Sequence, residues 1–95
     1  MRRRRLEDDQ INEALGDLDG WKVDDGWLKK RYDFRNFAES LAFVNKVGEI
    51  AEDEDHHPDF KFGWGYVELE LTTHDRGGLT QRDFDVAKRI DSIGQ

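Results

Sequence analysis

The clearest structural signal in this chain is an alternating stretch, Tyr66-Val67-Glu68-Leu69-Glu70-Leu71-Thr72-Thr73. Its apolar members Val67, Leu69 and Leu71 share one parity, and the residues between them are polar. Successive side chains of a β-strand point to opposite faces, so the pattern predicts a strand with one buried and one exposed face. The glycines on either side of Trp64 indicate a turn or bulge, with a short strand at residues 61–64 before it.

Upstream of that strand, the longest helical pattern runs from about Phe37 to Glu54. Asn36 followed by Glu39 resembles a capping box at its start, and Pro58 ends it. Its apolar stripe is wide enough to face both a sheet and another subunit. The stripe consists of Phe37, Leu41, Val44 and Gly48, widened by Phe43, Val47, Ile50 and Ala51.

Two shorter helices are predicted, one near each end of the chain. The first begins at Asp8 or Asp9 and stops at Gly20. The last begins at Thr80, with an acidic residue three positions later, and stops at Gly94. Their apolar residues recur at helical spacing: Ile11, Ala14, Leu15 and Leu18 in the first, and Phe84, Ala87, Ile90 and Ile93 in the last.

Residues 21–34 predict a β-hairpin, because two aromatic-bearing runs flank the turn sequence Asp24-Asp25-Gly26. Leu28, Tyr32 and Phe34 share one face of its second strand. The predicted order is therefore α-β-β-α-β-β-α. Hairpins and helices without regular βαβ units favour an α+β two-layer sandwich. A chain of 95 residues without a linker is expected to be a single domain, residues 1–95.

The composition excludes several classes of protein. The chain has no cysteine, which removes disulfides, thiolate catalysis, cysteine-based zinc sites and iron–sulfur ligation. No apolar run approaches the roughly 18 residues of a membrane span, and no apolar segment follows the basic start as in a secretory signal. We therefore expect a cytoplasmic protein.

The charge distribution argues against direct nucleic-acid binding. The net charge is −7, and without the run Arg2-Arg3-Arg4-Arg5 it would be −11, whereas nucleic-acid-binding proteins carry basic faces. The arginine run has two interpretations. Either residues 1–6 form a frayed, solvated basic tail, or the run is a phosphate-binding arm.

The three histidines are the best candidates for chemistry. His56, His57 and His74 lie in one window of the sequence, at the ends of predicted elements, where functional groups tend to be presented. Ser40 and Ser92 fall within helical stretches, which argues against a Ser/His/Asp site. Adjacent residues of an extended segment point in opposite directions, so a shared zinc ion would need a sharp backbone turn. Zinc stays open as an alternative.

Four carboxylates, Glu52, Asp53, Glu54 and Asp55, precede the first two histidines at a helix C-terminus, where the dipole disfavours negative charge. One interpretation is that they stabilise a protonated imidazole, which could then donate a proton near neutral pH. The other is that an acidic protein simply carries acidic helix ends. His74 has the parity of the polar face of the best strand, which fits either a site wall or a plain surface histidine.

Aromatic residues surround the histidines in the sequence. They could stack on a flat heteroaromatic ligand, or they could serve the core or an interface of a small domain. These residues are Phe60, Phe62, Trp64 and Tyr66.

Two blocks carry a family resemblance: Glu52-Asp53-Glu54-Asp55-His56-His57-Pro58-Asp59-Phe60, and Leu71-Thr72-Thr73-His74-Asp75-Arg76-Gly77-Gly78-Leu79-Thr80 followed by Asp83. At this separation they resemble the pterin-4a-carbinolamine dehydratase family. The similarity includes Gly20-Trp21, residues 34–43 and the closing helix, and covers the chain from about Leu15 to its end. It implies a four-stranded antiparallel sheet with helices packed on one face, and a homodimer or homotetramer.

The resemblance also implies a reaction, the dehydration of a 4a-hydroxytetrahydropterin (4a-carbinolamine) to quinonoid dihydropterin and water. This hydro-lyase step, that of 4a-hydroxytetrahydrobiopterin dehydratase, recycles the tetrahydropterin cofactor and belongs to tetrahydrobiopterin biosynthesis. The family needs no metal and no cofactor of its own, because the substrate is itself a modified pterin. The 4a-hydroxyl leaves well only when protonated, and N5 gives up a proton. Imidazoles suit both transfers at neutral pH.

The family's site is carried over residue by residue. The catalytic histidines fall on His56, His57 and His74, without an individual assignment of acid and base. Positions implied to contact or orient the pterin are Asp55, Pro58, Phe60, Thr72, Thr73 and Asp75. Two acidic positions implied to support the site are Glu52 and Asp83.

Alternatives and departures accompany this interpretation. Some relatives stabilise dimers of a transcription regulator, so the chain could be a protein-interaction module. A dehydratase could also act on another reduced pterin.

The sequence departs from the family pattern in three places. Phe60 stands where many relatives carry Trp, and residues 61–65 are unusually rich in glycine. The Arg2–Arg5 run has no known counterpart in the family.

Overall fold

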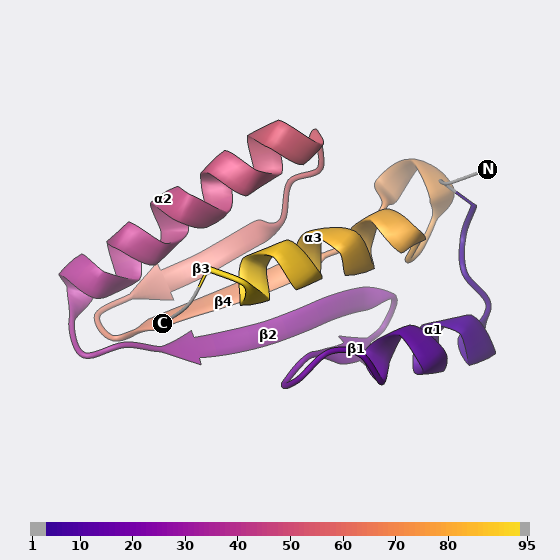
Figure 1. Ribbon diagram of the computed structural model, residues 1–95, viewed down its shortest axis with the longest axis horizontal. Coiled ribbons are helices and arrows are strands. Elements are labelled where there is room, and N and C mark those ends of the chain that lie inside the picture. The colour runs from indigo at the N-terminus through magenta and orange to yellow at the C-terminus, as the bar shows by residue number, and fades with distance from the viewer. Residues whose placement is uncertain (1–3, 94–95) are drawn as a thin grey trace.

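The computed structural model describes residues 4–93, which form three α-helices and one antiparallel sheet of four strands (Figure 1). The predicted α+β class and element order are confirmed, with one 3₁₀ turn added after the fourth strand. The order is α1 (Asp8–Leu15), β1 (Lys22–Asp24), β2 (Trp27–Asp33), α2 (Phe37–Glu54), β3 (Asp59–Gly63), β4 (Tyr66–Leu71), the 3₁₀ turn η1 (His74–Arg76) and α3 (Gln81–Asp91).

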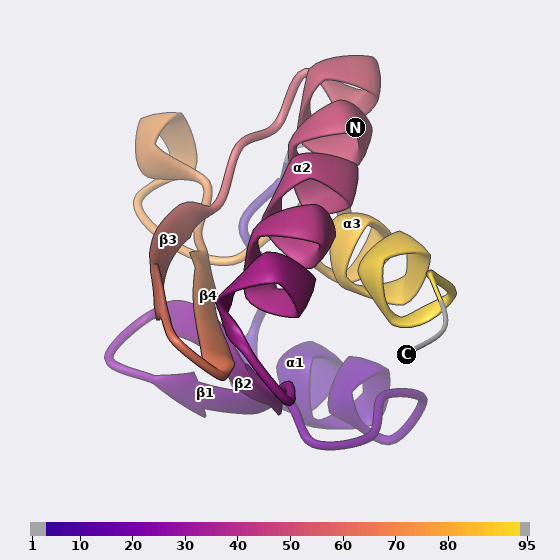
Figure 2. The same cartoon turned by 90° about the vertical axis from the view of Figure 1, so that its left-hand side faces the viewer.

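The sheet has the strand order β1-β2-β4-β3, and every neighbouring pair is antiparallel. Figure 2 shows all three helices on the same side of it, so two layers are formed as predicted. The opposite face is charged. There Lys29 lies opposite Glu70 and Arg31 opposite Glu68, and each pair forms a salt bridge.

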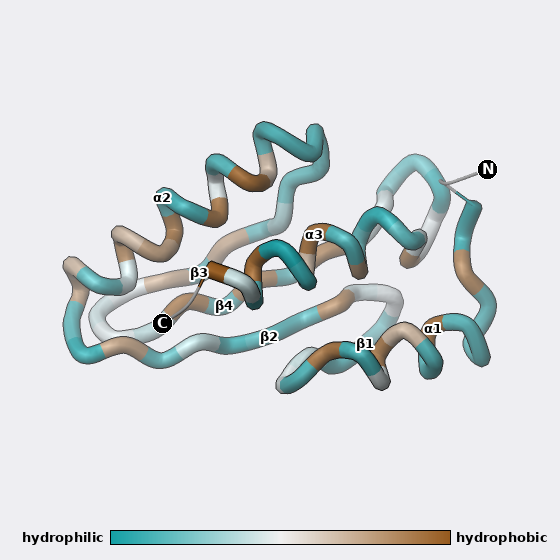
Figure 3. Tube along the Cα trace, viewed as in Figure 1, coloured by the Kyte–Doolittle hydropathy of each residue, from teal (hydrophilic) through white to brown (hydrophobic). Residues whose placement is uncertain are grey.

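Strand β4 confirms the alternation of the Tyr66–Thr73 stretch. Val67, Leu69 and Leu71 are fully buried against the helices, whereas Glu68 and Glu70 are only partly buried on the charged face. The hydropathy colours of Figure 3 alternate in the same way along the strand. The regular ladder ends at Leu71, because the chain then turns into η1 and only a single bridge, from Thr73 to Gly78, continues the pairing.

The first hairpin turns at the predicted position. Asp25 and Gly26 both have positive φ, at 52° and 83°, which is the geometry of a two-residue type I′ turn. Such a turn matches the twist of the two strands, and it places Trp27 at the first position of β2.

Helix α2 has the predicted bounds. The Asn36 side chain accepts from the N–H of Glu39, but the Glu39 carboxylate accepts from the N–H of Arg35, so the capping box is not reciprocal. Phe43 and its neighbours on the inner face are buried. Phe37 and Leu41 remain 45% and 40% exposed, so the stripe is wider than the sheet can cover.

The first and last helices differ in detail from their predicted ends. Helix α1 ends at Leu15, and the chain continues in a tighter turn, in which the N–H of Asp17 donates to Ala14 and that of Leu18 to Leu15. Leu18 still packs on the core beyond the helix end. Gly20, at φ 82°, only redirects the chain into β1. The predicted stop at Gly94 lies outside the described residues, within which α3 ends at Asp91.

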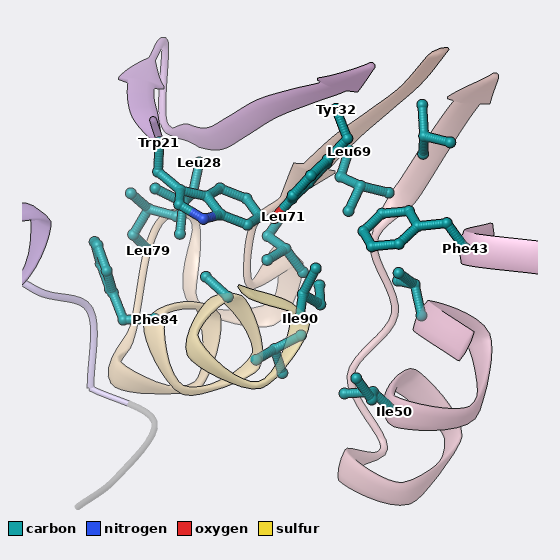
Figure 4. Packing of buried hydrophobic residues seen from close by; sticks show 14 residues of the cluster. Trp21, Leu28, Tyr32, Phe43, Ile50, Leu69, Leu71, Leu79, Phe84 and Ile90 are labelled. Carbon is teal, nitrogen blue, oxygen red and sulfur yellow. The ribbon is translucent and has the colours of Figure 1, made fainter. Parts of the chain in front are cut away.

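The core lies between the sheet and α2 and α3 (Figure 4). Phe84 and Ile90 of α3 pack against Leu28 and Leu71 of the sheet, and Phe43 joins from α2. Burial of this single cluster is the main favourable contribution to folding.

The predicted basic tail, residues 1–6, is attached to the fold at Leu6. Its N–H donates to the carbonyl of Leu79 at 2.8 Å, and its side chain packs on the core. Residues 1–3 of the predicted tail lie outside the described residues. Within residues 4–93, no helix is long and apolar enough to span a bilayer.

Candidate functional site

The C-terminus of α2 delivers His56 to the start of α3. Asp55 adopts a left-handed conformation at φ 52°, and the N–H of His56 returns to the carbonyl of Ala51, which closes the helix end. The reversal places Nε2 of His56 2.6 Å from Oδ1 of Asp83, a fully buried carboxylate. The sequence predicted both residues for the site, and the structure brings them together.

Asp83 is satisfied on both oxygens. Its Oδ2 accepts from the hydroxyl of Thr73 at 2.8 Å and from the N–H of Thr80 at 2.9 Å. A hydroxyl has one proton to donate, and Thr73 donates it to Asp83. The Thr73 oxygen must therefore accept from the hydroxyl of Thr80, 2.9 Å away. Burying a carboxylate is costly unless it is hydrogen-bonded, and three donors meet that need.

This network determines which nitrogen of His56 is free. A carboxylate can only accept, so Nε2 of His56 carries the hydrogen that points at Asp83. Within residues 4–93 every buried side-chain nitrogen and oxygen has a partner, and Nδ1 of His56 has none there, so Nδ1 reaches solvent. The side chain as a whole is only 12% exposed. His56 is therefore an oriented imidazole with one nitrogen, Nδ1, exposed to solvent.

His57 has a different environment. Its Nε2 lies 2.5 Å from Oε2 of Glu52, one turn back on α2, and the two side chains are 53% and 79% exposed. His57 is thus paired with a carboxylate at the surface, beside the buried pair of His56.

His74 opens η1, is exposed, and meets the Trp27 ring edge-on, with centroids 5.4 Å apart and planes at 75°. It follows Thr73 directly, so the Asp83 network ties its turn to His56. Figure 1 shows the end of α2, η1 and the start of α3 in the same half of the molecule along its long axis. The three predicted histidines therefore share one half of the fold.

The acidic end of α2 is explained mainly by arginines. Arg89 binds the carboxylates of Asp53 and Glu54 at 2.7 and 2.6 Å. Arg82 donates to the backbone carbonyls of Glu54 and Asp55, the orphan acceptors of the helix end. Only one of the four carboxylates, that of Glu52, contacts a histidine, and two others are paired with Arg89.

The sequence pattern did not single out Arg82, although it joins α2 to α3 beside the site. An arginine in the first turn of a helix is not favoured by the dipole. That mismatch was the one available signal of a tertiary role.

The aromatic residues near the histidines in sequence mostly lie far from them in space. Strand β3 runs away from the histidine end, and its five residues span roughly 16 Å before the turn at Trp64. Phe62 stacks on Phe37, Tyr66 lies under Arg31, and Trp64 is 73% exposed at the far turn. Only Phe60 stays near the start of β3.

The remaining predicted contact residues divide by burial. Asp55, Phe60 and Asp75 are exposed, Phe60 at 37%. Pro58 and Thr73 are buried, so their surfaces are already covered by protein. The Thr72 hydroxyl donates to the carbonyl of Gly26 at 2.8 Å and so ties the first hairpin turn to the end of β4.

No group of three histidine, aspartate or glutamate side chains within residues 4–93 is arranged to hold a metal ion. His56 and His57 instead bind separate carboxylates. The arrangement offers two carboxylate-oriented imidazoles and a third exposed one, which is suited to proton transfer.

Comparison with known proteins agrees with these features. Residues 4–93 match the sequence model of the family described as pterin 4 alpha carbinolamine dehydratase. The chain is 48% identical to a protein of Roseiflexus sp. strain RS-1, over 94% of this chain and 96% of that one. It is 44% identical to a protein of Sulfolobus acidocaldarius, over 94% and 98%. Both carry the provisional name pterin-4-alpha-carbinolamine dehydratase.

Among solved structures, the chain resembles one described as a transcriptional coactivator/pterin dehydratase from Brucella melitensis. The TM-score is 0.91 at 31% sequence identity, and the match covers 97% of this chain and all of the other. The family match begins at residue 4, so the similarity extends further toward the N-terminus than Leu15.

Proposed function

The chain belongs to the pterin-4a-carbinolamine dehydratase family, and on that basis we propose that it converts a 4a-hydroxytetrahydropterin to quinonoid dihydropterin and water. The reaction is that of a hydro-lyase. The observation that carries the proposal is the His56–Asp83 pair: an imidazole oriented by a buried carboxylate, with Nδ1 open to solvent, next to a second carboxylate-paired histidine.

The chemistry asks for one acid and one base. The C4a–oxygen bond breaks as the hydroxyl takes up a proton, the N5–H proton is lost, and the electron pair left on N5 forms the N5=C4a double bond. Water is the only other product, so no oxidant or reductant is required. Each positioned acid or base contributes about 10²–10⁴-fold.

His56 and His57 divide these two proton transfers, and His74 approaches the pterin from the η1 side. Asp83 and Glu52 hold the first two rings in place, as the distances of 2.6 and 2.5 Å support. Thr73 acts through Asp83, and Thr72 through the hairpin turn, because their hydroxyls are engaged there. Asp55, Phe60 and Asp75, which are exposed, contribute to the walls around the pterin, and the buried Pro58 supports the loop that carries the two histidines.

A coupled assay tests this proposal. Phenylalanine hydroxylase generates the 4a-carbinolamine in situ, and ultraviolet absorbance follows its decay with and without this protein. We expect faster decay with wild type, a loss of at least about 100-fold for His57→Ala, and no acceleration for the His56→Ala/His57→Ala double variant. Glu13→Gln, an exposed change on α1, is the matched control and should keep full activity.

Two results would contradict the proposal. One is full activity in folded His57→Ala. The other is a folded wild-type protein that leaves the decay rate unchanged. A panel of reduced pterins run in the same assay separates a biopterin dehydratase from an enzyme for another reduced pterin.

A homo-oligomer is also proposed, and the partly exposed Phe37 and Leu41 on α2 support it. The outer edge of β3, which pairs with no further strand within residues 4–93, supports it as well. Light scattering after size exclusion should give a dimer or tetramer mass, and Leu41→Glu should lower that mass. A monomer in wild type would contradict it. The cytoplasmic location stays a prediction.

The same α2 surface favours a second candidate function, a protein-interaction module, since the similar structure from Brucella melitensis is described as a coactivator as well as a dehydratase. Such a module would use α2 and not the histidines. Partner binding that survives the His56→Ala/His57→Ala change but not Leu41→Glu would favour it.

A further inference from the structure

The three tryptophans occupy three different environments. Trp21 is buried and donates its indole N–H to Asp91 at 2.9 Å, so it belongs to the core. Trp64 is 73% exposed at the turn farthest from the histidines. Trp27 is partly buried and stands outside the core cluster. Its partner is His74.

The backbone holds Trp27 rigidly beside the site. It follows a two-residue turn in which Asp25 and Gly26 both have positive φ, a tight connection with little freedom. The hydroxyl of Thr72 donates to the carbonyl of Gly26, so the turn is fastened to the end of β4 two residues before His74.

The face of the sheet decides where the indole can act. Leu28 points into the core, so the preceding residue projects on the charged side of the sheet. Thr72 directly follows β4, and its hydroxyl donates to the carbonyl of Gly26, the residue before Trp27. Trp27 therefore lies beside Thr72, at the end of the sheet where His74 begins.

We propose that Trp27 is a specificity-determining residue, whose indole restricts the orientation of the His74 imidazole and forms the aromatic wall on which the flat pterin ring stacks. This inference rests on the proposed dehydratase function and adds to it the surface that recognises the ring. The near-perpendicular contact with His74 limits rotation of the imidazole, and the part of the indole left exposed is free for a ligand.

The other aromatic residues cannot take this role. Phe62 and Tyr66 are engaged with Phe37 and Arg31, and Trp64 lies at the far turn. Phe60 faces the helix side of the sheet, because it is paired with the inward-pointing Leu69. Trp27 is the aromatic side chain that contacts a predicted catalytic histidine within residues 4–93.

The test compares Trp27→Leu with Trp64→Leu, its matched control. Titration calorimetry with 7,8-dihydrobiopterin, a stable probe, measures binding, and the coupled assay measures kcat and KM. Aromatic contacts of this kind correspond to about a three- to tenfold effect. We expect Trp27→Leu to weaken pterin binding and raise KM by that factor, Trp27→Phe to restore both to within about twofold, and Trp64→Leu to match wild type.

A spectroscopic measurement tests, independently of activity, whether Trp27 restricts the orientation of the His74 imidazole. Loss of the indole ring current in Trp27→Leu should change the NMR chemical shifts of the His74 imidazole protons and leave those of His57 unchanged. Thr72→Val keeps Trp27 but removes the tether to Gly26, so it should give a smaller change in the same direction in binding and in the His74 signals.

Three outcomes overturn the inference: wild-type binding and KM in Trp27→Leu, an equal loss in Trp64→Leu, or unchanged His74 signals. Each of these leaves the dehydratase function standing when the wild-type protein is active. A wild-type protein that neither binds the pterin nor accelerates the decay overturns the proposed function and this inference together, so the two failures are distinguishable.

Discussion

Helix α3 carries an aspartate at each end, and the two ends are used differently. Asp83, in the first turn, is fully buried and accepts from His56, Thr73 and Thr80. Asp91, the last helical residue, is 25% exposed and accepts from Trp21, Lys30 and Tyr32. The two residues are eight positions apart, which corresponds to about 12 Å along the helix axis.

The two ends differ in the hydrogen-bond donors that meet each aspartate. Lys30 neutralises Asp91 at 3.0 Å and lies over the rings of Tyr32 and Trp21, so that end is a closed anchor between α3 and the first hairpin. At the other end the nearest titratable donor is His56, whose second nitrogen reaches solvent. The same side chain on the same helix thus anchors the first hairpin at one end and, at the other, orients an imidazole that has one nitrogen exposed to solvent.

The largest expected effect is on activity, from Asp83→Asn. The amide oxygen must replace Oδ2 to accept from Thr73 and Thr80, so the amide NH₂ faces His56 and forces its proton onto Nδ1. We expect kcat to fall about 10²–10⁴-fold, because the solvent-facing Nδ1 of His56 then carries the proton and can no longer accept one. The free energy of unfolding should fall by only about 1–3 kcal/mol. Single-turnover rates together with urea unfolding measure the two separately. Near-normal kcat in this variant would remove the distinction between the two ends.

The next effect is on stability, from Asp91→Ala. Removing this carboxylate leaves the indole N–H of Trp21 and the hydroxyl of Tyr32 without their acceptor, and both side chains are buried. We expect the free energy of unfolding to fall by about 2–4 kcal/mol, with kcat below the melting temperature within twofold of wild type. Calorimetric melting and the coupled assay check this pair of results. A large loss of kcat in the folded variant would show that the anchor also serves the site.

The smallest expected effect is a pH dependence of stability that arises from Tyr32, at the Asp91 end of the helix. Burial, with the hydrogen bond to Asp91, raises the pKa of Tyr32 well above its usual value. A raised folded-state pKa stabilises the protein fully below the unfolded pKa, near 10, and this contribution is lost as the pH rises above it. Wild type should therefore lose melting temperature between pH 9 and pH 11 more steeply than Tyr32→Phe.

At neutral pH, Tyr32→Phe should cost about 1 kcal/mol, since Trp21 and Lys30 still satisfy Asp91. Equal alkaline slopes for the two proteins would show that Tyr32 does not carry the pH dependence. Asp83→Asn should leave the difference between those slopes unchanged, because the two networks are separate.

Local patterns predicted most of the fold. Alternation at Val67, Leu69 and Leu71, the Asp-Gly turn before Trp27 and the cap at Asn36 were confirmed, because each depends on residues close in sequence. The end of α1 was misplaced, since Leu18 packs on the core from outside the helix and so extends the apparent helical spacing.

The family membership could also be predicted from the sequence, from the His-His-Pro and Thr-His-Asp blocks. Their histidines were identified as site residues, and the structure brings them to one half of the molecule. The arginine partners of the acidic helix end could not be predicted, because Arg82 and Arg89 meet it across the α2–α3 interface.

By itself, the sequence determined the elements, the family and the identity of the titratable groups, because these follow from local spacing and residue type. Tertiary structure alone decided which nitrogen of His56 is free, since that depends on a buried Asp83 27 residues away. It also decided that Trp27, and not the aromatic residues nearest the histidines in sequence, lies against His74. Both choices come from packing between distant segments, which no local pattern encodes.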